Sequence, residues 1–352
     1  MTVRDRVLTV EEVFRRELEM CGVNEGDTVA ILSHGTERAE YADLFLGACR
    51  QLGAAGVHVR LLPPRPMPLD VPMTRVDQYS ILADNEAAVD MLKRADLVID
   101  LVFLLYAPEL YQILGAGTRV LSVLDPLSNL IRLFPTTDLR ERVEAGEELL
   151  RRASSLRVTS PHGTDVTYRL GVYPVTTQYG YTDTAGRWDL WPSGFLFTGG
   201  ADDGVDGKVV LSPGDAIVLP HLAYVREPVE FAIEQGRVVD VRGGVEASLL
   251  AEYMAAFNDP QAYGISHIGW GLNERARWNA LAMGVPGNIG MDNRCYYGNV
   301  MFSTGPNLEL GGTNDTACHI DLPMRGCSLF LDDEPIIIDG EILVDEMKAP
   351  GR

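Results

Sequence analysis

The chain has 352 residues, 46% of them hydrophobic, which is enough for two domains with apolar cores. Its formal net charge of -20 argues against nucleic acid and anionic membranes as partners, since both are negatively charged. The sequence shows neither the about 18 consecutive apolar residues of a membrane helix nor the apolar core of a secretory signal. We therefore expect a cytoplasmic protein that binds a small molecule.

The first half of the chain alternates between helical and strand patterns. Apolar residues recur at helical spacing in residues 7–23, 41–56, 88–95, 107–117 and 140–156. Buried strand patterns occupy residues 27–33, 57–63, 96–103 and 118–125. This alternation indicates an open parallel sheet with helices on both faces, so we predict an α/β domain over residues 1–155. No GxGxxG motif follows the first strand, which argues against a nicotinamide cofactor.

The pattern changes near residue 156 to short strands separated by glycines and turns. Such strands are predicted over residues 156–160, 165–170, 208–212, 215–220, 229–244, 327–333 and 334–343. One helix is predicted over residues 245–258, and a second near residues 271–283. We therefore predict a β-rich α+β domain over residues 156–352, and we place the metal-binding catalytic site in it.

Three side chains form a candidate metal site. His319 and Asp321 stand two residues apart in "TACHIDLPMRG", and in a strand such residues point to the same face. His267 lies in "YGISHIGWGLN", a stretch that we interpret as a loop presenting the imidazole into an exposed cleft. Two imidazoles and one carboxylate on one side of an octahedral ion leave three positions open, which suits Fe(II), and the same set can hold zinc. From spacing alone, a His-x-Asp pair that is merely salt-bridged stays an alternative.

Four stretches carry a resemblance to a known family: residues 178–198, 257–278, 296–307 and 311–333. They resemble the 2,5-dihydroxypyridine 5,6-dioxygenases, non-haem iron enzymes of nicotinate-type degradation, and the likeness extends from residue 27 to residue 333. The resemblance implies Fe(II) ligation by His267, His319 and Asp321. It also implies cleavage of a hydroxylated pyridine by O₂, giving N-formylmaleamate or an analogue, and we expect a homo-oligomer.

The chain is more distantly similar to the M29 leucyl aminopeptidases, which hold two metal ions. Those peptidases carry glutamate ligands where this chain has Phe195 and His267. Hard cations need anionic oxygen ligands, so the loss of both carboxylates implies a site for a single metal ion.

The chain departs from the dioxygenase pattern at Tyr106 and Leu190, where the family carries histidine, so the resemblance leaves the exact substrate open. We expect Tyr106 and Ser303 to act in catalysis, Tyr106 by orienting the substrate and Ser303 by fixing the ring. Further substrate contacts are expected from Trp188, Trp191, Ser193 and Thr304. Arg294 and Arg325 are either partners of an anionic substrate group or ordinary salt-bridged residues.

Two other classes of function stay open. A zinc hydrolase would use the same three ligands with a general base such as Glu274 or Asp292. A non-catalytic small-molecule binding protein would need neither metal nor base. Oxygen consumption and metal content distinguish the three classes.

Overall fold

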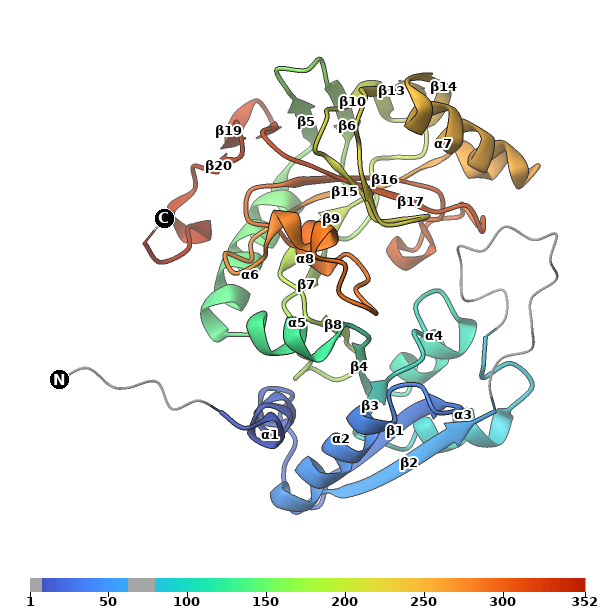
Figure 1. Cartoon of the computed structure of the whole chain (residues 1–352), viewed down its shortest axis with the longest axis vertical. Coiled ribbons are helices and arrows are strands. Elements are labelled where there is room, and N and C mark those ends of the chain that lie inside the picture. Colours follow the sequence, from blue (N-terminus) through green and yellow to red (C-terminus); the bar gives the residue numbers. More distant parts are fainter. Residues whose placement is uncertain (1–7, 63–79, 352) are drawn as a thin grey trace. The chain divides into compact units, whose positions relative to one another are not determined.

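The computed structural model describes residues 8–62 and 80–351 (Figure 1). The chain divides into two compact units. Unit 1 contains the described residues as far as Phe134 together with Gly180–Trp191, and unit 2 contains Pro135–Tyr179 and the chain from Pro192 onward. The boundaries therefore differ from the single boundary expected after residue 155. The helix expected near residues 140–156 belongs to unit 2, and a later segment returns to unit 1.

Unit 1 is built on a five-stranded sheet whose neighbouring strands all run parallel. In spatial order the strands are β2 (Ala55–Leu61), β1 (Thr28–His34), β3 (Leu97–Asp100), β4 (Arg119–Val123) and β8 (Trp188–Trp191). Every residue of β3 is buried, as expected for a strand covered on both faces. The predicted open parallel sheet is confirmed. Strand β8 was not predicted.

Helices cover both faces of this sheet, again as predicted. They are α1 (Val10–Met20), α2 (Ala39–Leu52), α3 (Glu86–Leu92), α4 (Pro108–Gly115) and α5 (Leu127–Arg132). Apolar side chains of α3 and α4 form one buried cluster with Leu32, Val98 and Val120 of the sheet. Phe14 of α1 is buried as well, and it packs edge-on against Trp191 of β8. Helix α1 begins at a capping box in which Thr9 and Glu12 bond each other's backbone N–H groups.

Unit 2 contains antiparallel sheets, which confirms the β-rich prediction. The larger sheet has the order β14 (Arg237–Gly243), β13 (Val229–Glu234), β10 (Val205–Leu211), β6 (Asp165–Arg169), β5 (Ser155–Thr159), β18 (Ser328–Leu331), β19 (Glu334–Ile338) and β20 (Glu341–Ile342). A second sheet has the order β17 (Ile320–Met324), β16 (Val300–Thr304), β15 (Ile265–Gly271), β9 (Phe195–Thr198) and β7 (Thr176–Gln178). Strands β11 (Ala216–Ile217) and β12 (Ala223–Tyr224) form a short pair.

The helical segments of unit 2 include α6 (Thr137–Arg152), α7 (Val245–Ala256) and the short α8 (Met291–Arg294). The predicted helix over residues 245–258 is confirmed by α7. Short 3₁₀ helices are η2 (Pro260–Tyr263), η3 (Trp278–Met283), η4 (Leu308–Leu310) and η5 (Asp345–Met347). The second predicted helix, near residues 271–283, is only the 3₁₀ turn η3, because β15 ends at Gly271 and residues 272–277 form a turn with an isolated bridge from Asn273 to Tyr296. No helix among the described residues is long and apolar enough to cross a membrane.

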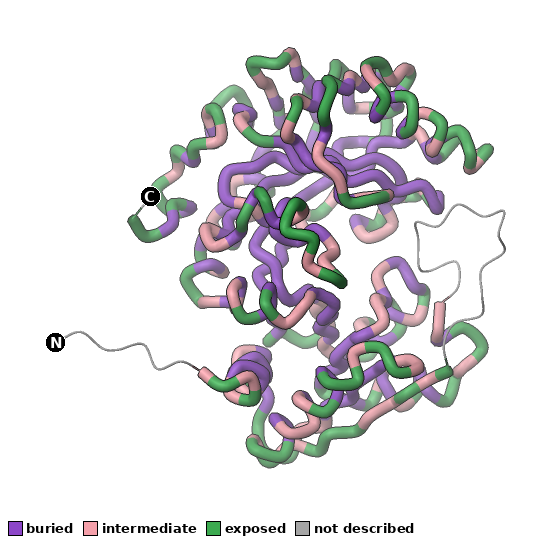
Figure 2. Tube along the Cα trace, in the orientation of Figure 1, coloured by how far each residue is buried: buried purple, intermediate pink, exposed green. Residues whose placement is uncertain are grey.

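Strands β15, β16 and β17 lie in the interior of unit 2. All of their residues are buried, as Figure 2 shows. The loop that we predicted around His267 is therefore wrong, because the stretch forms the buried strand β15. Its glycines permit close packing: a Cβ atom at Gly269 would lie 2.1 Å from the carbonyl oxygen of Leu196 on the neighbouring strand.

Candidate metal centre

Neighbouring strands of the buried sheet carry the candidate ligands. Asp321 of β17 pairs in register with Ser303 of β16, and His319 directly precedes β17. His267 lies on β15, where the ladder to β16 is irregular between Ile265 and Ile268. Such a bulge re-aims the side chains beside it. The sheet therefore brings together residues that are far apart in the sequence.

His267, His319 and Asp321 place their potential ligand atoms within 4.8 Å of one another. The Nε2 atoms of His267 and His319 lie 3.5 and 3.2 Å from Oδ1 of Asp321. Among the described residues, no other group of three histidine, cysteine or acidic side chains meets in this way. The three residues are only 5%, 5% and 3% exposed, so the expected exposed cleft is replaced by a buried site.

The hydrogen bonding of this cluster is incomplete. Oδ1 of Asp321, the oxygen that faces both imidazoles, is buried and accepts no hydrogen bond, and Nδ1 of His267 also lacks a partner. A buried polar atom left without a partner costs about 1–3 kcal/mol, and more when it is charged. A cation between the three side chains would satisfy Oδ1. Two imidazoles and one carboxylate are also the donor set that a mononuclear Fe(II) or zinc site uses.

Electrostatics favours the protonation states that metal binding requires. Burial lowers the pKa of His267 to about 4, and the nearby charge of Asp321 opposes this only partly, so the imidazole is neutral near pH 7. Burial would raise the pKa of Asp321, but the neighbouring His319 and the positive charge of Arg294 outweigh it and hold this pKa well below its usual range. The centre therefore offers a neutral imidazole and a carboxylate anion.

Three further side chains surround the cluster. Arg294 of α8 donates two hydrogen bonds to Oδ2 of Asp321, at 3.0 and 2.9 Å, so it is salt-bridged to a candidate ligand. The Ser303 hydroxyl is hydrogen-bonded to Nε2 of His319 at 3.1 Å. The ring of Phe197 lies 4.8 Å from the His267 ring, measured between centroids. Sequence reasoning missed Phe197, since a phenylalanine in an apolar strand gives no functional signal.

Three other predicted residues of unit 2 lie in less suitable positions. Ser193 is buried and donates a hydrogen bond to the side chain of Gln178 at 3.3 Å. Thr304 is buried too, and successive strand residues face opposite sides, so Thr304 points away from the face that presents Ser303. A substrate contact shared by Ser303 and Thr304 is therefore not supported. Arg325 stacks on the Trp278 ring, with the guanidinium carbon 4.9 Å from the centroid.

The suggested bases of a hydrolase are engaged elsewhere. Glu274 forms an ion pair with the buried guanidinium of Arg142. Asp292 is fully buried and accepts a hydrogen bond from the backbone N–H of Arg277 at 2.7 Å. Phe195, which stands where the M29 peptidases carry a glutamate, stacks on Phe197 with 5.5 Å between ring centroids. These contacts do not favour the hydrolase alternative.

The remaining predicted residues belong to unit 1. Trp191 is fully buried against Phe14 and Phe134, with ring centroids 5.4 and 5.9 Å apart. This is the environment of a core residue, so we do not retain Trp191 as a substrate contact. Trp188 is half-buried, and its indole N–H donates to the Ser122 hydroxyl at 2.9 Å.

Tyr106 lies in a strained loop that follows β3. Tyr106 and Phe103 adopt left-handed backbone conformations, with φ of 70° and 68°. The loop begins at the buried Asp100, whose side chain accepts hydrogen bonds from the backbone N–H groups of Val102, Phe103 and Leu104. Bulky residues adopt such conformations only where the surrounding structure enforces them, and such strain is concentrated at functional sites.

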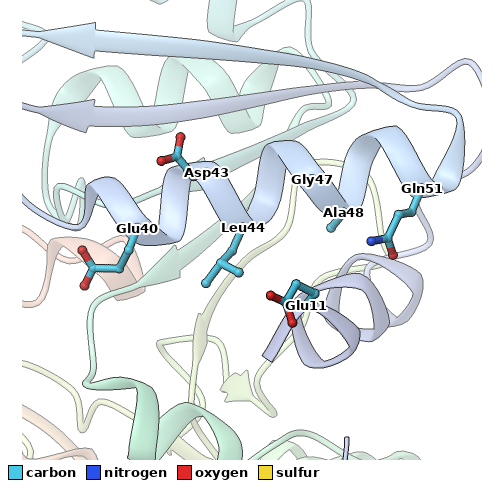
Figure 3. A pocket seen from close by; sticks show the side chains of 7 residues that line it. All are labelled: Glu11, Glu40, Asp43, Leu44, Gly47, Ala48 and Gln51. Carbon is cyan, nitrogen blue, oxygen red and sulfur yellow. The ribbon is translucent and has the colours of Figure 1, made fainter. Parts of the chain in front are cut away.

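A separate pocket of about 450 Å³ lies between α1 and α2 in unit 1 (Figure 3). It is lined by Glu11, Glu40, Asp43, Leu44, Gly47, Ala48 and Gln51. Its acidic side chains come from helix surfaces, and it lacks imidazole or thiol groups. It therefore offers no set of ligands comparable to that in unit 2.

Comparison with known proteins gives one consistent family for nearly the whole chain. Residues 9–344 match the model of the family described as 2,5-dihydroxypyridine 5,6-dioxygenase. A Pseudomonas putida KT2440 protein of that name is 42% identical over 349 residues, covering 98% of this chain and 99% of the relative. The solved structure of 2,5-dihydroxypyridine dioxygenase from the same organism has a TM-score of 0.91, with 42% identity, and covers 96% of this chain and 98% of that chain. The structure of AmpT from Thermus thermophilus covers 95% of this chain and 99% of its own, with a TM-score of 0.60 and 15% identity, which shows a common fold.

Proposed function

The chain belongs to the 2,5-dihydroxypyridine 5,6-dioxygenase family of ring-cleaving dioxygenases, and on this premise we propose that it opens a hydroxylated pyridine with O₂ at one Fe(II) ion. His267, His319 and Asp321 would hold the ion. The observation that carries the proposal is the convergence of both Nε2 atoms on Oδ1 of Asp321, a buried oxygen that accepts no hydrogen bond. A single anionic ligand with two neutral ones suits one divalent ion.

When bound, Fe(II) would supply the electronic coupling between O₂ and an electron-rich ring, which do not react directly at a useful rate. The protein would supply three ligands on one side and so leave three positions for the reactants. In the reaction of the family, both atoms of O₂ enter the product as a ring C–C bond breaks, so 2,5-dihydroxypyridine and O₂ together give N-formylmaleamate. No other reductant or oxidant is needed.

Three side chains would position the substrate. The Ser303 hydroxyl lies 3.1 Å from a ligand nitrogen, so it is close enough to the centre to bond a ring hydroxyl or carbonyl oxygen there. Tyr106 would donate a hydrogen bond, because a phenol stays protonated at neutral pH where a histidine can act as a base. The half-buried Trp188 would offer part of its ring for stacking.

The proposal is tested by anaerobic reconstitution of the full chain with Fe(II), followed by an oxygen-electrode screen of hydroxypyridines and their carboxylates. We expect one O₂ consumed for each ring opened, and no consumption by the zinc-loaded protein. Iron binding without oxygen consumption on any of these rings would overturn the proposal. Hydrolysis of leucyl amides by the zinc-loaded protein would instead favour the hydrolase. Binding of a hydroxypyridine without bound metal would favour the binding protein.

A further inference from the structure

We propose that Arg294 is a positioning residue that makes Asp321 a one-oxygen ligand and so keeps open a metal position needed by the reactants. The inference rests on the proposed function, since it concerns the same metal centre. From the sequence alone, Arg294 was considered as a contact for an anionic substrate group. The inference assigns it a different role. It also explains why only one of the two carboxylate oxygens lacks a partner.

The contacts of Arg294 with Asp321 all fall on one oxygen. Nε and Nη2 lie 3.0 and 2.9 Å from Oδ2, while Oδ1 receives no hydrogen bond and faces the two imidazoles. Both side chains are largely buried, at 12% and 5% exposure, where charge-assisted hydrogen bonds are strong. Turning Oδ2 toward a metal would break two such bonds. Oδ1 is therefore the oxygen that is available for coordination.

The guanidinium is itself held by the fold. Nη1 donates to the backbone carbonyl of Ile289 at 2.6 Å, so all three nitrogens of the group are engaged. The backbone carbonyl of Arg294 accepts a hydrogen bond from the Asn299 side chain at 3.1 Å, and the same amide group donates to Asn293. Arg294 is therefore fixed before a metal binds, which is the condition for imposing a geometry on its partner.

The number of carboxylate oxygens on the metal decides how many positions remain. With one oxygen and two imidazoles, an octahedral ion has three open positions, and a chelating carboxylate would remove one of them. A reaction that brings a ring substrate and O₂ to the same ion depends on these positions. If the hydrogen bonds from Arg294 to Oδ2 are lost, we therefore expect a weaker reaction with O₂ while the metal ion is still bound.

Two substitutions in the full chain test this role. Arg294→Gln removes the charge and the fork of donors, whereas Arg294→Lys keeps the charge but offers a single nitrogen. Arg325→Gln is the matched control, because it also removes an arginine charge from unit 2 but from a side chain stacked on Trp278. The first measurement is the number of water molecules on bound Mn²⁺, from the line broadening of ¹⁷O-labelled water. The second is the KM for O₂ of the Fe(II) protein.

We expect about three waters on Mn²⁺ in the parent chain and in Arg325→Gln, and about two in both Arg294 variants. Metal affinity should fall by roughly 10–100-fold in these variants, so excess metal still loads them. The KM for O₂ should rise by more than about tenfold, with a smaller change in the substrate KM. Three waters and an unchanged KM for O₂ in Arg294→Gln would overturn the inference. Full recovery by Arg294→Lys would also overturn it, since charge alone would then suffice. A parent chain that binds no metal would instead contradict the proposed function.

Discussion

The backbone of Gly305 lies directly against that of His319. A Cβ atom at Gly305 would be 3.1 Å from the Cα atom of His319 and 2.0 Å from the carbonyl oxygen of Cys318, and Gly305 has a φ of 111°. Neither backbone atom can move aside as a flexible side chain would. The glycine of "FSTGPN" therefore sets the position of His319, a proposed metal ligand.

Gly305→Ala should displace the segment that carries His319. Metal affinity should fall at least about tenfold, and the free energy of unfolding should fall by about 1–3 kcal/mol from crowding. Gly311→Ala is the control, since Gly311 also has a positive φ, of 81°, but a Cβ atom there would meet nothing within 4 Å. Chelator competition and denaturant unfolding measure the two effects. Equal losses in both variants would show that only the backbone conformation matters.

Replacing a ligand should remove bound iron. We expect His267→Ala, His319→Ala and Asp321→Asn to lose most of it, because the two alanine variants each delete a ligand and Asp321→Asn replaces the one anionic ligand with a neutral amide. Asp321→Asn is preferred to alanine, because removing the whole side chain would leave the charge of Arg294 without a buried partner. Ser266→Ala is the control, since its hydroxyl bonds the Pro306 carbonyl instead of the cluster. If all three ligand variants bound as much iron per chain as the parent protein, His267, His319 and Asp321 would not be the metal ligands.

The chain should hold no more than one metal ion tightly and should not cleave leucyl amides with zinc, cobalt or manganese. Phe195 places a stacked aromatic ring, not a carboxylate, on β9, and a second divalent ion would lack anionic ligands there. Metal analysis after dialysis and a peptidase assay measure both quantities. Two ions per chain at similar occupancy, together with peptide turnover, would contradict this expectation.

Tyr106 and Leu190 should govern which ring is accepted. Histidine at both positions matches the family pattern, so the Tyr106→His and Leu190→His double variant should gain activity on 2,5-dihydroxypyridine. Tyr106→Phe should slow turnover of the native substrate, because buried partners left unpaired cost up to several kcal/mol. The measurement is kcat/KM for each variant on each ring. Unchanged ratios would place both residues outside the substrate site.

Glu17 should make unit 1 less stable as the pH rises. Its side chain is fully buried in α1, one of its oxygens has no partner, and burial, aided by Asp189, raises its pKa well above the usual value. The unfolded chain therefore releases this proton at lower pH than the folded chain, so stability falls above about pH 4.5. Glu17→Met should remove this loss and stabilise the protein by about 1–3 kcal/mol at neutral pH. Urea unfolding at pH 5 and pH 8 measures it, and the same pH dependence in both proteins would exclude Glu17 as the cause.

The order of apolar and polar residues along the chain predicted those helices and strands whose burial shows in their own sequence. The apolar runs of β1, β3 and β4 identify buried parallel strands. The spacing of His319 and Asp321 correctly predicts that their side chains meet, although His319 lies one residue before β17 and not within it. Strand β8 is only four residues long, contains Asp189 and pairs with β4, which is far away in the sequence. Nothing in its own sequence shows that partner.

The site was predicted in part for the same reason. His267 was chosen on the interpretation that its glycine-rich stretch is a loop, and the family resemblance then supported it, whereas the stretch is the buried strand β15. The contact of Arg294 with Asp321 depends on how α8 packs against β17, and neither segment has a pattern that specifies it.

Each unit is formed by segments that are separated in the sequence by a segment of the other unit. This limits how the gene can be cut to produce one unit alone. A fragment that ends at Phe134 lacks β8, so it leaves β4 as an unpaired edge that invites self-association. The complementary fragment, beginning at Pro135, still contains Gly180–Trp191, but it lacks the sheet of unit 1 to which this segment belongs. Neither unit can be expressed as one uninterrupted stretch of the natural sequence. Unit 1 would have to be produced from a rearranged gene that joins residue 134 to residue 180 through a linker, and unit 2 from one that bridges residues 179 and 192.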